Sequence, residues 1–119
     1  RTVGIHPILI HGGGPAINQA MKAAKLEPKW VAGLRYTDTD TLRIVQDVLS
    51  NVINRGLVEE MQSLGARAKP LHPRTRPVVR AARHTGTDAD GKPVDLGFVG
   101  EVTGEIEEHT SELQSRQVI

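Results

Sequence analysis

The glycine run in the segment His11–Pro15 is the part of this sequence best suited to chemistry. Three consecutive glycines follow the short apolar run 8–10 and precede a segment with helical periodicity. Without side chains, their backbone N–H groups can approach an anion, and the N-terminus of a following helix adds partial positive charge. Open α/β sheets bind ligands at the carboxyl ends of their strands. We therefore expect an anion site here in preference to a purely structural turn.

Other glycine-rich motifs do not fit the same stretch. A dinucleotide-binding fingerprint would need glycine in place of Ile17. A Walker loop needs Gly-Lys-Ser/Thr, an esterase oxyanion loop needs a G-x-S-x-G nucleophile elbow, and the sequence contains neither. His11 could act in catalysis, but a structural hydrogen bond is the role that we favour. The histidines show no metal-ligand spacing, and no residue is identified as a general base.

Arg35, within the segment Gly33–Asp38, is the second candidate. It precedes the start of an expected helix, where a guanidinium can reach across a cleft and hold a carboxylate through two parallel hydrogen bonds. A lone arginine more often forms a surface ion pair. Its occurrence together with the glycine run favours the carboxylate-binding role.

The elements expected around these residues are those of an α/β fold. Residues 8–10 predict a buried strand of a parallel sheet, and Pro15 suits the first turn of a helix over 16–25. Strand, glycine turn and helix in this order open an α/β unit. After a connection over 26–37, apolar residues at three- and four-residue spacing predict a long helix over 39–64.

Local signals mark the start, the middle and the end of this long helix. Thr37 and Asp40 resemble a capping box. The run 54–56 (Asn-Arg-Gly) should kink or divide the helix, because an interior glycine costs about 1 kcal/mol relative to alanine. Gly65 is suited to end it.

The remainder of the chain predicts mainly strands. The prolines of 70–77 exclude that segment from a central strand and indicate an edge or a rigid loop. In chain order we expect strands at 66–71 and 78–84, a turn at 87–91, a returning strand at 94–102, a helix at 106–114 and the start of a strand at 118–119.

Composition indicates one globular domain with an aliphatic core. The 119 residues are 38% hydrophobic and 24% charged but only 3% aromatic, and they include no cysteine. No apolar run approaches the roughly 20 residues of a membrane span, and no signal peptide is visible, so we expect a cytoplasmic protein without membrane binding. Residues 67–84 carry six basic and no acidic side chains, and 85–119 carry two basic and eight acidic ones. Such segments can pair internally, and without aromatic platforms we expect no nucleic-acid binding.

Four motifs together resemble those of acetylglutamate kinases, members of the amino acid kinase superfamily. In chain order they are HGGGP at 11–15, GLRYTD at 33–38, NRGLV at 54–58 and DLGFVGEV at 95–102. The resemblance implies a three-layer α/β/α sandwich with a mainly parallel sheet and a β-hairpin around residues 78–102. It also implies phosphoryl transfer from MgATP to the side-chain carboxylate of N-acetyl-L-glutamate, a step of arginine biosynthesis.

The resemblance also assigns roles to individual residues. The amides of Gly13 and Gly14 would hold the carboxylate that is phosphorylated, with His11 and Gly12 in support, and Arg35 would bind the substrate's α-carboxylate. The family's catalytic lysines and nucleotide pocket have no counterpart in residues 1–119. We therefore expect a single partial domain, the substrate-binding half of the fold, with no catalytic residue of its own and no activity alone.

Further expectations concern partners and substrate choice. Kinases of this type commonly form a homodimer or a higher homo-oligomer through a long helix, here 39–64, and arginine is a feedback inhibitor of some. Where such kinases have a glycine-rich loop, this chain has prolines and arginines at 71–77, so we expect an effect on substrate selectivity. Two alternatives stay open: a sister kinase for an aminoadipate-type or carrier-linked substrate, and a non-catalytic module that binds an amino-acid derivative or a partner protein.

Overall fold

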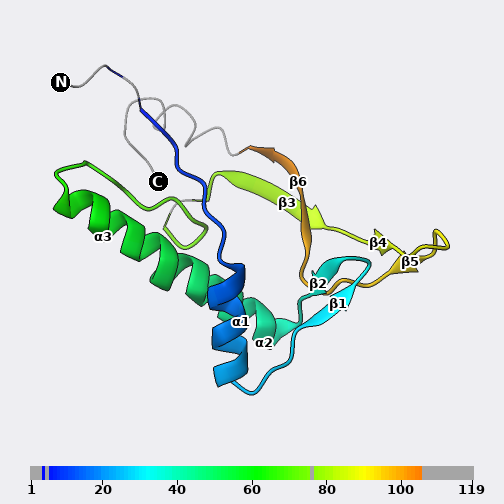
Figure 1. The fold of residues 1–119 in the computed structure, drawn as a ribbon. Helices are drawn as coiled ribbons and strands as arrows, with labels where there is room; N and C mark the ends of the chain where they lie inside the picture. Colours follow the sequence, from blue (N-terminus) through cyan, green and yellow to red (C-terminus); the bar gives the residue numbers. More distant parts are fainter. Residues whose placement is uncertain (1–3, 5, 76, 106–119) are drawn as a thin grey trace.

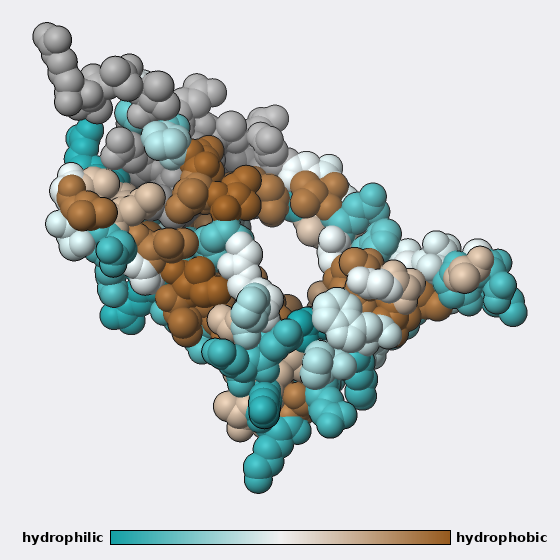
Figure 2. Space-filling model, viewed as in Figure 1, coloured by the Kyte–Doolittle hydropathy of each residue, from teal (hydrophilic) through white to brown (hydrophobic). Residues whose placement is uncertain are grey.

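The computed structural model describes residues 4, 6–75 and 77–105 (Figure 1). The helices lie on one side of the molecule and the strands, arranged as hairpins, on the other. The radius of gyration is 16.9 Å, whereas a compact domain of this length would have about 13.5 Å. Figure 2 shows the reason, an opening between the helical part and the hairpins. The chain is therefore an open arrangement of elements with little shared core.

Helix α1, Gly14–Ala23, follows the glycine run as the sequence predicts. Pro15 lies in its first turn, where a missing N–H costs nothing. Ile17 and Met21 form its buried face. The helix ends two residues earlier than expected, because Lys25 adopts a left-handed conformation and Leu26 N–H donates to the carbonyl of Met21, closing a Schellman motif.

The long helix is continuous but changes its hydrogen-bonding pattern along its length. It consists of α2 (Thr39–Asp47), the π-helical segment η1 (Val48–Asn54) and α3 (Arg55–Ser63). The hydrogen-bonding pattern changes from π-helical to α-helical between Asn54 and Arg55, within the run where the sequence predicts a kink or a division of the helix. The predicted stop is confirmed, because Gly65 has a φ of 86° and a second Schellman bond joins Ala66 N–H to the Met61 carbonyl.

The predicted capping box at the start of this helix is wrong. Asp38 is the N-cap, and its carboxylate accepts a 2.8 Å hydrogen bond from the backbone N–H of Thr41. Thr37 cannot serve because its side-chain hydroxyl donates to the carbonyl of Arg35 and its backbone pairs with another segment.

Two small apolar clusters hold the helices. Ile17 and Met21 of α1 pack with Val48 of η1, and Val58 of α3 packs with Ala68. Among the described residues, few apolar side chains are buried, which agrees with the open shape. No helix in the described part of the chain is both long and apolar enough to cross a membrane.

A hairpin that the sequence did not predict occupies much of the connection 26–37. Strands β1 (Lys29–Val31) and β2 (Leu34–Tyr36) pair in antiparallel fashion. The two turn residues, Ala32 and Gly33, both have positive φ, at 49° and 77°, as a two-residue hairpin turn of type I′ requires. This hairpin presents Arg35 from its second strand.

The predicted hairpin around 78–102 is present. Strand β3 (Val79–Arg83) pairs with β6 (Gly100–Glu105), and between them β4 (Gly86–Thr87) pairs with β5 (Pro93–Val94), all antiparallel. Asp88 closes the expected turn, since its carboxylate accepts from the backbone N–H groups of Asp90 and Lys92. The predicted returning strand is interrupted at residues 95–99. These residues leave the hairpin and contact the backbone of Thr37.

Two strand predictions are wrong in the described structure. Residues 8–10 form no strand beyond a single bridge residue, and Ile8, Leu9 and Ile10 are 55%, 41% and 89% exposed. Residues 66–71 also form no strand; Ala68 packs on α3 instead. A buried parallel strand needs neighbours on both sides and cover on both faces, and the described residues do not supply them.

The wider architecture stays a prediction. The named strands of the described residues pair only in antiparallel fashion, and the parallel element among them is an isolated bridge between Thr37 and Gly97. The three-layer sandwich with a mainly parallel sheet is thus not confirmed by this structure. The helix expected at 106–114 and the strand at 118–119 lie outside the described residues.

Candidate functional site

The glycine run forms the N-terminus of α1, as an anion site of this kind requires. Gly13 is the N-cap, and its carbonyl accepts a 2.9 Å hydrogen bond from the N–H of Ile17. The N–H groups of Gly13 and Gly14 donate to no acceptor within the described part of the chain. The first N–H groups of a helix have no partner inside the helix and carry partial positive charge. These two amides are therefore available to an anion.

Gly13 lies close against side chains of the long helix. A Cβ at this position would lie 2.6 Å from Cδ1 of Ile53 and 2.8 Å from Cδ2 of Leu49, both in η1. A Cβ at Gly12 or Gly14 would meet nothing within 4 Å. The loop thus rests on η1 through Gly13, while the space beside the other two glycines is open.

His11 connects the same loop to η1 through its ring. Its Nδ1 lies 3.2 Å from the carbonyl of Gly12, and its Nε2 lies 3.3 Å from Nδ2 of Asn54. A carbonyl accepts and an amide nitrogen donates, so both contacts are made by one neutral tautomer with its proton on Nδ1. The geometry supports the structural hydrogen bond that the sequence favoured for this histidine.

Arg35 reaches from β2 to the side of α1. Its Nη2 donates to Oδ1 of Asn18 at 2.6 Å, its Nη1 lies 3.1 Å from Sδ of Met21, and its Cζ lies 4.9 Å from the centre of the Trp30 ring. Asn18 follows Gly14 by one helical turn, about 6 Å along the axis. The guanidinium therefore lies beside the middle of the helix that the glycine run begins.

The side chain of Arg35 is half-buried and makes no ion pair with an acidic residue of the described segments. Within the described segments, Arg35 therefore does not form the surface ion pair that was the alternative interpretation of this residue. Asn18 and Trp30 hold the guanidinium while leaving some of its donors free, an arrangement suited to a ligand carboxylate.

The backbone of the Arg35 segment is fixed by the fourth motif. Thr37 N–H donates to the carbonyl of Leu96 at 3.0 Å, and Phe98 N–H donates to the carbonyl of Thr37 at 2.7 Å. Gly97 has a φ of 72°, and a Cβ there would overlap the Thr37 carbonyl, so only glycine allows the approach. Leu96 is fully buried beneath this bridge.

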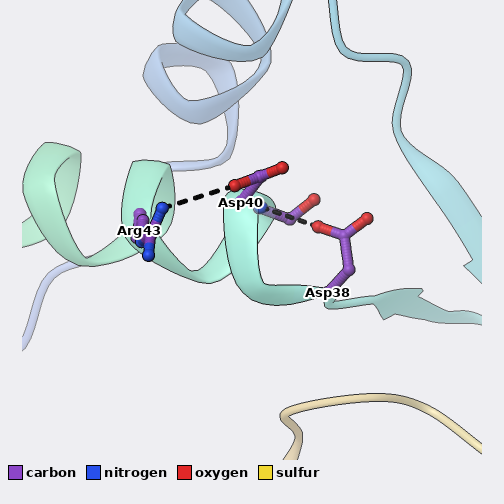
Figure 3. A network of polar contacts seen from close by, with 4 residues as sticks. Asp38, Asp40 and Arg43 are labelled. Atoms are coloured by element: carbon purple, nitrogen blue, oxygen red, sulfur yellow. Dashed lines mark hydrogen bonds and ion pairs between the residues drawn. The ribbon is translucent and has the colours of Figure 1, made fainter.

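Carboxylates close to the site are already engaged. Asp38 caps α2, and the hydrogen bond from the Thr41 backbone holds the pKa of its carboxyl below the ordinary value. Figure 3 shows this cap and the neighbouring ion pair, in which Nη1 of Arg43 lies 3.6 Å from Oδ1 of Asp40. Neither carboxylate is placed as a general base. The described residues also contain no group of three or more side chains that could hold a metal ion.

The proline- and arginine-rich loop lines a separate open pocket of about 450 Å³ against η1 and α3. Arg55 of α3 and Arg74 of the loop both line it. His72 lies in the wall with a buried Nδ1 that has no partner among the described residues; burial, and then the nearby Arg74 charge, lower its pKa. The predicted effect of this loop on substrate selectivity is untested by the structure.

Comparison with known proteins identifies the family. The model of the amino acid kinase family matches residues 1–118. The chain belongs to the amino acid kinase family. The resemblance carried by the four motifs is thereby confirmed.

The curated relatives of this amino acid kinase family chain include proteins named acetylglutamate kinase. One from Symbiobacterium thermophilum is 43% identical over 103 residues, which covers 86% of this chain and 35% of the relative. One from Methanococcus maripaludis is 41% identical over 105 residues, which covers 86% of this chain and 36% of the relative. The chain thus spans about a third of the length of these relatives.

A solved structure has the same fold. The crystal structure of smu.665 from Streptococcus mutans UA159 is 30% identical, with a TM-score of 0.76. The match covers 97% of this chain and 44% of that one. A similar arrangement of helices and hairpins is therefore also found within a larger protein of known structure.

Three residues at this site were missed by the sequence analysis. Asn18 and Trp30 hold Arg35, and Asn54 holds His11. Asn18 carried a usable signal, because it lies one turn beyond the glycine run on the helix expected there. Asn54 was noticed only as part of a helix break, and nothing near Trp30 in sequence marked it as a stacking partner.

Proposed function

We propose that this chain is the substrate-binding part of an acetylglutamate kinase, a phosphotransferase that uses MgATP and N-acetyl-L-glutamate. The observation that carries the proposal is the position of Arg35, held by Asn18 and Trp30 beside the helix whose free N-terminal amides are those of Gly13 and Gly14. Two anion-binding elements, the helix N-terminus and an arginine that contacts the same helix from β2, suit a dicarboxylate. The acetylglutamate kinase names of the relatives agree with this substrate.

The proposed division of labour follows from the chemistry of each element. The amides of Gly13 and Gly14 would receive the carboxylate that accepts the phosphoryl group and stabilise the negative charge shared in the transition state. Arg35 would hold the α-carboxylate through paired hydrogen bonds and fix the distance of the other end from the amides. MgATP would supply the phosphoryl group, and we assign it no side-chain ligand in this chain.

The experiment that tests this proposal replaces Arg35 in the full polypeptide. Arg35→Ala should weaken acetylglutamate binding by about 2–5 kcal/mol if the ion pair is desolvated. Arg35→Lys should recover only part of the loss, because an ammonium cannot form the paired geometry. Arg43→Ala is the matched control, since Arg43 is 75% exposed and its partner Asp40 is 69% exposed. Calorimetric titration with an unchanged affinity for Arg35→Ala would refute the assigned role.

A sister kinase is the second candidate, because Arg55 and Arg74 line a pocket beside the loop that departs from the family pattern. Parallel titrations with N-acetyl-L-glutamate and an N-acylated aminoadipate would separate the two. Tighter binding of the longer substrate would favour the sister kinase. Assembly into a homo-oligomer through the long helix, inhibition by arginine and a cytoplasmic location remain proposals that go with either assignment.

A further inference from the structure

Asn54 is a buried polar residue in the middle of an otherwise amphipathic helix. It is 3% exposed, and its described side-chain partner is the ring of His11, 43 residues away in sequence. Its Oδ1 is buried without a partner among the described residues. A buried amide is costly unless its hydrogen bonds are made. An apolar residue would serve the packing of this helix better, so the contact with His11 calls for another explanation.

The His11 ring joins this amide to the glycine run. The Nδ1–H donates to the Gly12 carbonyl, and Nε2 accepts from Nδ2 of Asn54. Both ring nitrogens are therefore used, one by the loop backbone and one by the helix. Any displacement of the Asn54 amide would be passed through the ring to the peptide that precedes Gly13.

Three residues of the π-helical segment lie against the glycine run and the histidine that precedes it. Leu49 and Ile53 meet Gly13, and Asn54 meets His11. Leu49 and Asn54 are five residues apart, the hydrogen-bonding interval of a π-helix, and π-helical turns occur frequently at functional sites. In this structure the π-helical register coincides with the place where the glycine run rests on the helix.

We propose that Asn54 is a positioning residue for the substrate carboxylate: through His11 it sets the orientation of the glycine amides. This inference rests on the proposed function of those amides. It goes beyond it by assigning a task to the third motif, NRGLV, whose first residue is Asn54. The competing explanation is that Asn54 contributes only to folding stability.

The test compares Asn54→Ala with Asn51→Ala in the full polypeptide. Asn51 is the matched control because it lies in the same π-helical segment, is exposed, and donates to Oδ1 of Asp47 and not to the loop. Asn54→Ala should weaken acetylglutamate binding by about tenfold or more, since small misplacements of a binding group are costly. It should also shift the NMR signals of the ¹⁵N-labelled glycine amides of the run. Asn51→Ala should do neither.

A double-mutant cycle between His11 and Asn54, measured as acetylglutamate affinity, provides a second test. If the two residues act as one unit, His11→Ala combined with Asn54→Ala should be no worse than either alone. Additive losses, or an Asn54→Ala protein that unfolds more easily but keeps its affinity and glycine signals, would overturn the proposal.

A measurement on the unmutated protein covers the case in which the variants do not fold. At a pH of about 8, where an ordinary imidazole is neutral, long-range ¹H–¹⁵N spectra should show the His11 proton on Nδ1. A proton on Nε2 would overturn the proposal. Failure of the unmutated protein to bind acetylglutamate would instead refute the proposed function, while the tautomer and the glycine signals would still decide the role of Asn54.

Discussion

Alanine substitutions at Gly13 and Gly14 should have opposite effects on stability although the two residues are adjacent. At Gly13 the new methyl group would lie 2.6 Å from Ile53 Cδ1 and 2.8 Å from Leu49 Cδ2. Ordinary carbon contacts are about 3.5–4.0 Å, so both side chains must move by roughly 1 Å. Overpacking of this kind costs about 1–3 kcal/mol, and the low end applies because the atoms that move are the ends of flexible side chains.

At Gly14 the same methyl group meets nothing within 4 Å. Gly14 is the first residue of α1, and its φ lies outside the left-handed region. Replacing a helical glycine by alanine stabilises by up to about 1 kcal/mol. In urea denaturation, the free energy of unfolding of Gly13→Ala should therefore be lower than that of Gly14→Ala by at least about 1 kcal/mol. Equal stabilities would refute the docking of the glycine run on η1.

Ligand binding separates the structural role of this loop from its proposed function. Gly14→Ala should bind acetylglutamate about tenfold more weakly, equivalent to about 1.4 kcal/mol, while being at least as stable as the unmutated protein. Gly13→Ala should lose both stability and affinity. A Gly14→Ala protein with full affinity would show that the ligand does not approach this amide from the side of the added methyl.

Two other predictions concern the segments that hold Arg35 in place. Gly97→Ala should lower the urea midpoint of unfolding and detach the loop 95–99. The positive φ at this position costs an alanine about 1–2 kcal/mol, and the new Cβ would overlap the Thr37 carbonyl. The Thr37 and Phe98 amides should then lose protection from hydrogen exchange, and unchanged protection would contradict the prediction. Asp38→Ala should destabilise at neutral pH through loss of the helix cap. The hydrogen bond from the Thr41 backbone holds the folded pKa of this carboxyl below its ordinary value. Its contribution to stability is therefore present above the ordinary pKa of an aspartate and is lost as the pH falls through the folded value. Urea midpoints of the variant and the unmutated protein should converge in acid, and a constant difference would contradict the assignment.

Features set by neighbouring residues in sequence were predictable. The start of α1 follows from the glycines and Pro15, the end of α3 from Gly65, and the turn of the long hairpin from Asp88 and Gly91. Each depends on a local preference of the backbone, which a short stretch of sequence carries. The same holds for the glycine amides, because a helix N-terminus leaves its first N–H groups free wherever it occurs.

Features that depend on distant partners were not predictable in the same way. Thr37 has the sequence of an N-cap, but its backbone is committed to Leu96 and Phe98, and so Asp38 takes its place. Residues 8–10 have the composition of a buried strand, yet burial depends on neighbours that the described residues do not provide. Asn18, which contacts Arg35, and Asn54, which contacts His11, likewise come from distant segments. No local sequence pattern predicts these contacts.

The contacts join the four motifs into a single chain of interactions. NRGLV contacts HGGGP through Asn54 and His11, α1 contacts GLRYTD through Asn18 and Arg35, and GLRYTD contacts DLGFVGEV through Thr37 and Gly97. The first link ends on His11, whose ring contacts the glycine run, the second ends on Arg35, and the third fixes the segment that carries Arg35. An open structure with a small core cannot hold such groups by packing alone. The hydrogen bonds between motifs therefore explain how the proposed substrate site would draw on residues from all four segments.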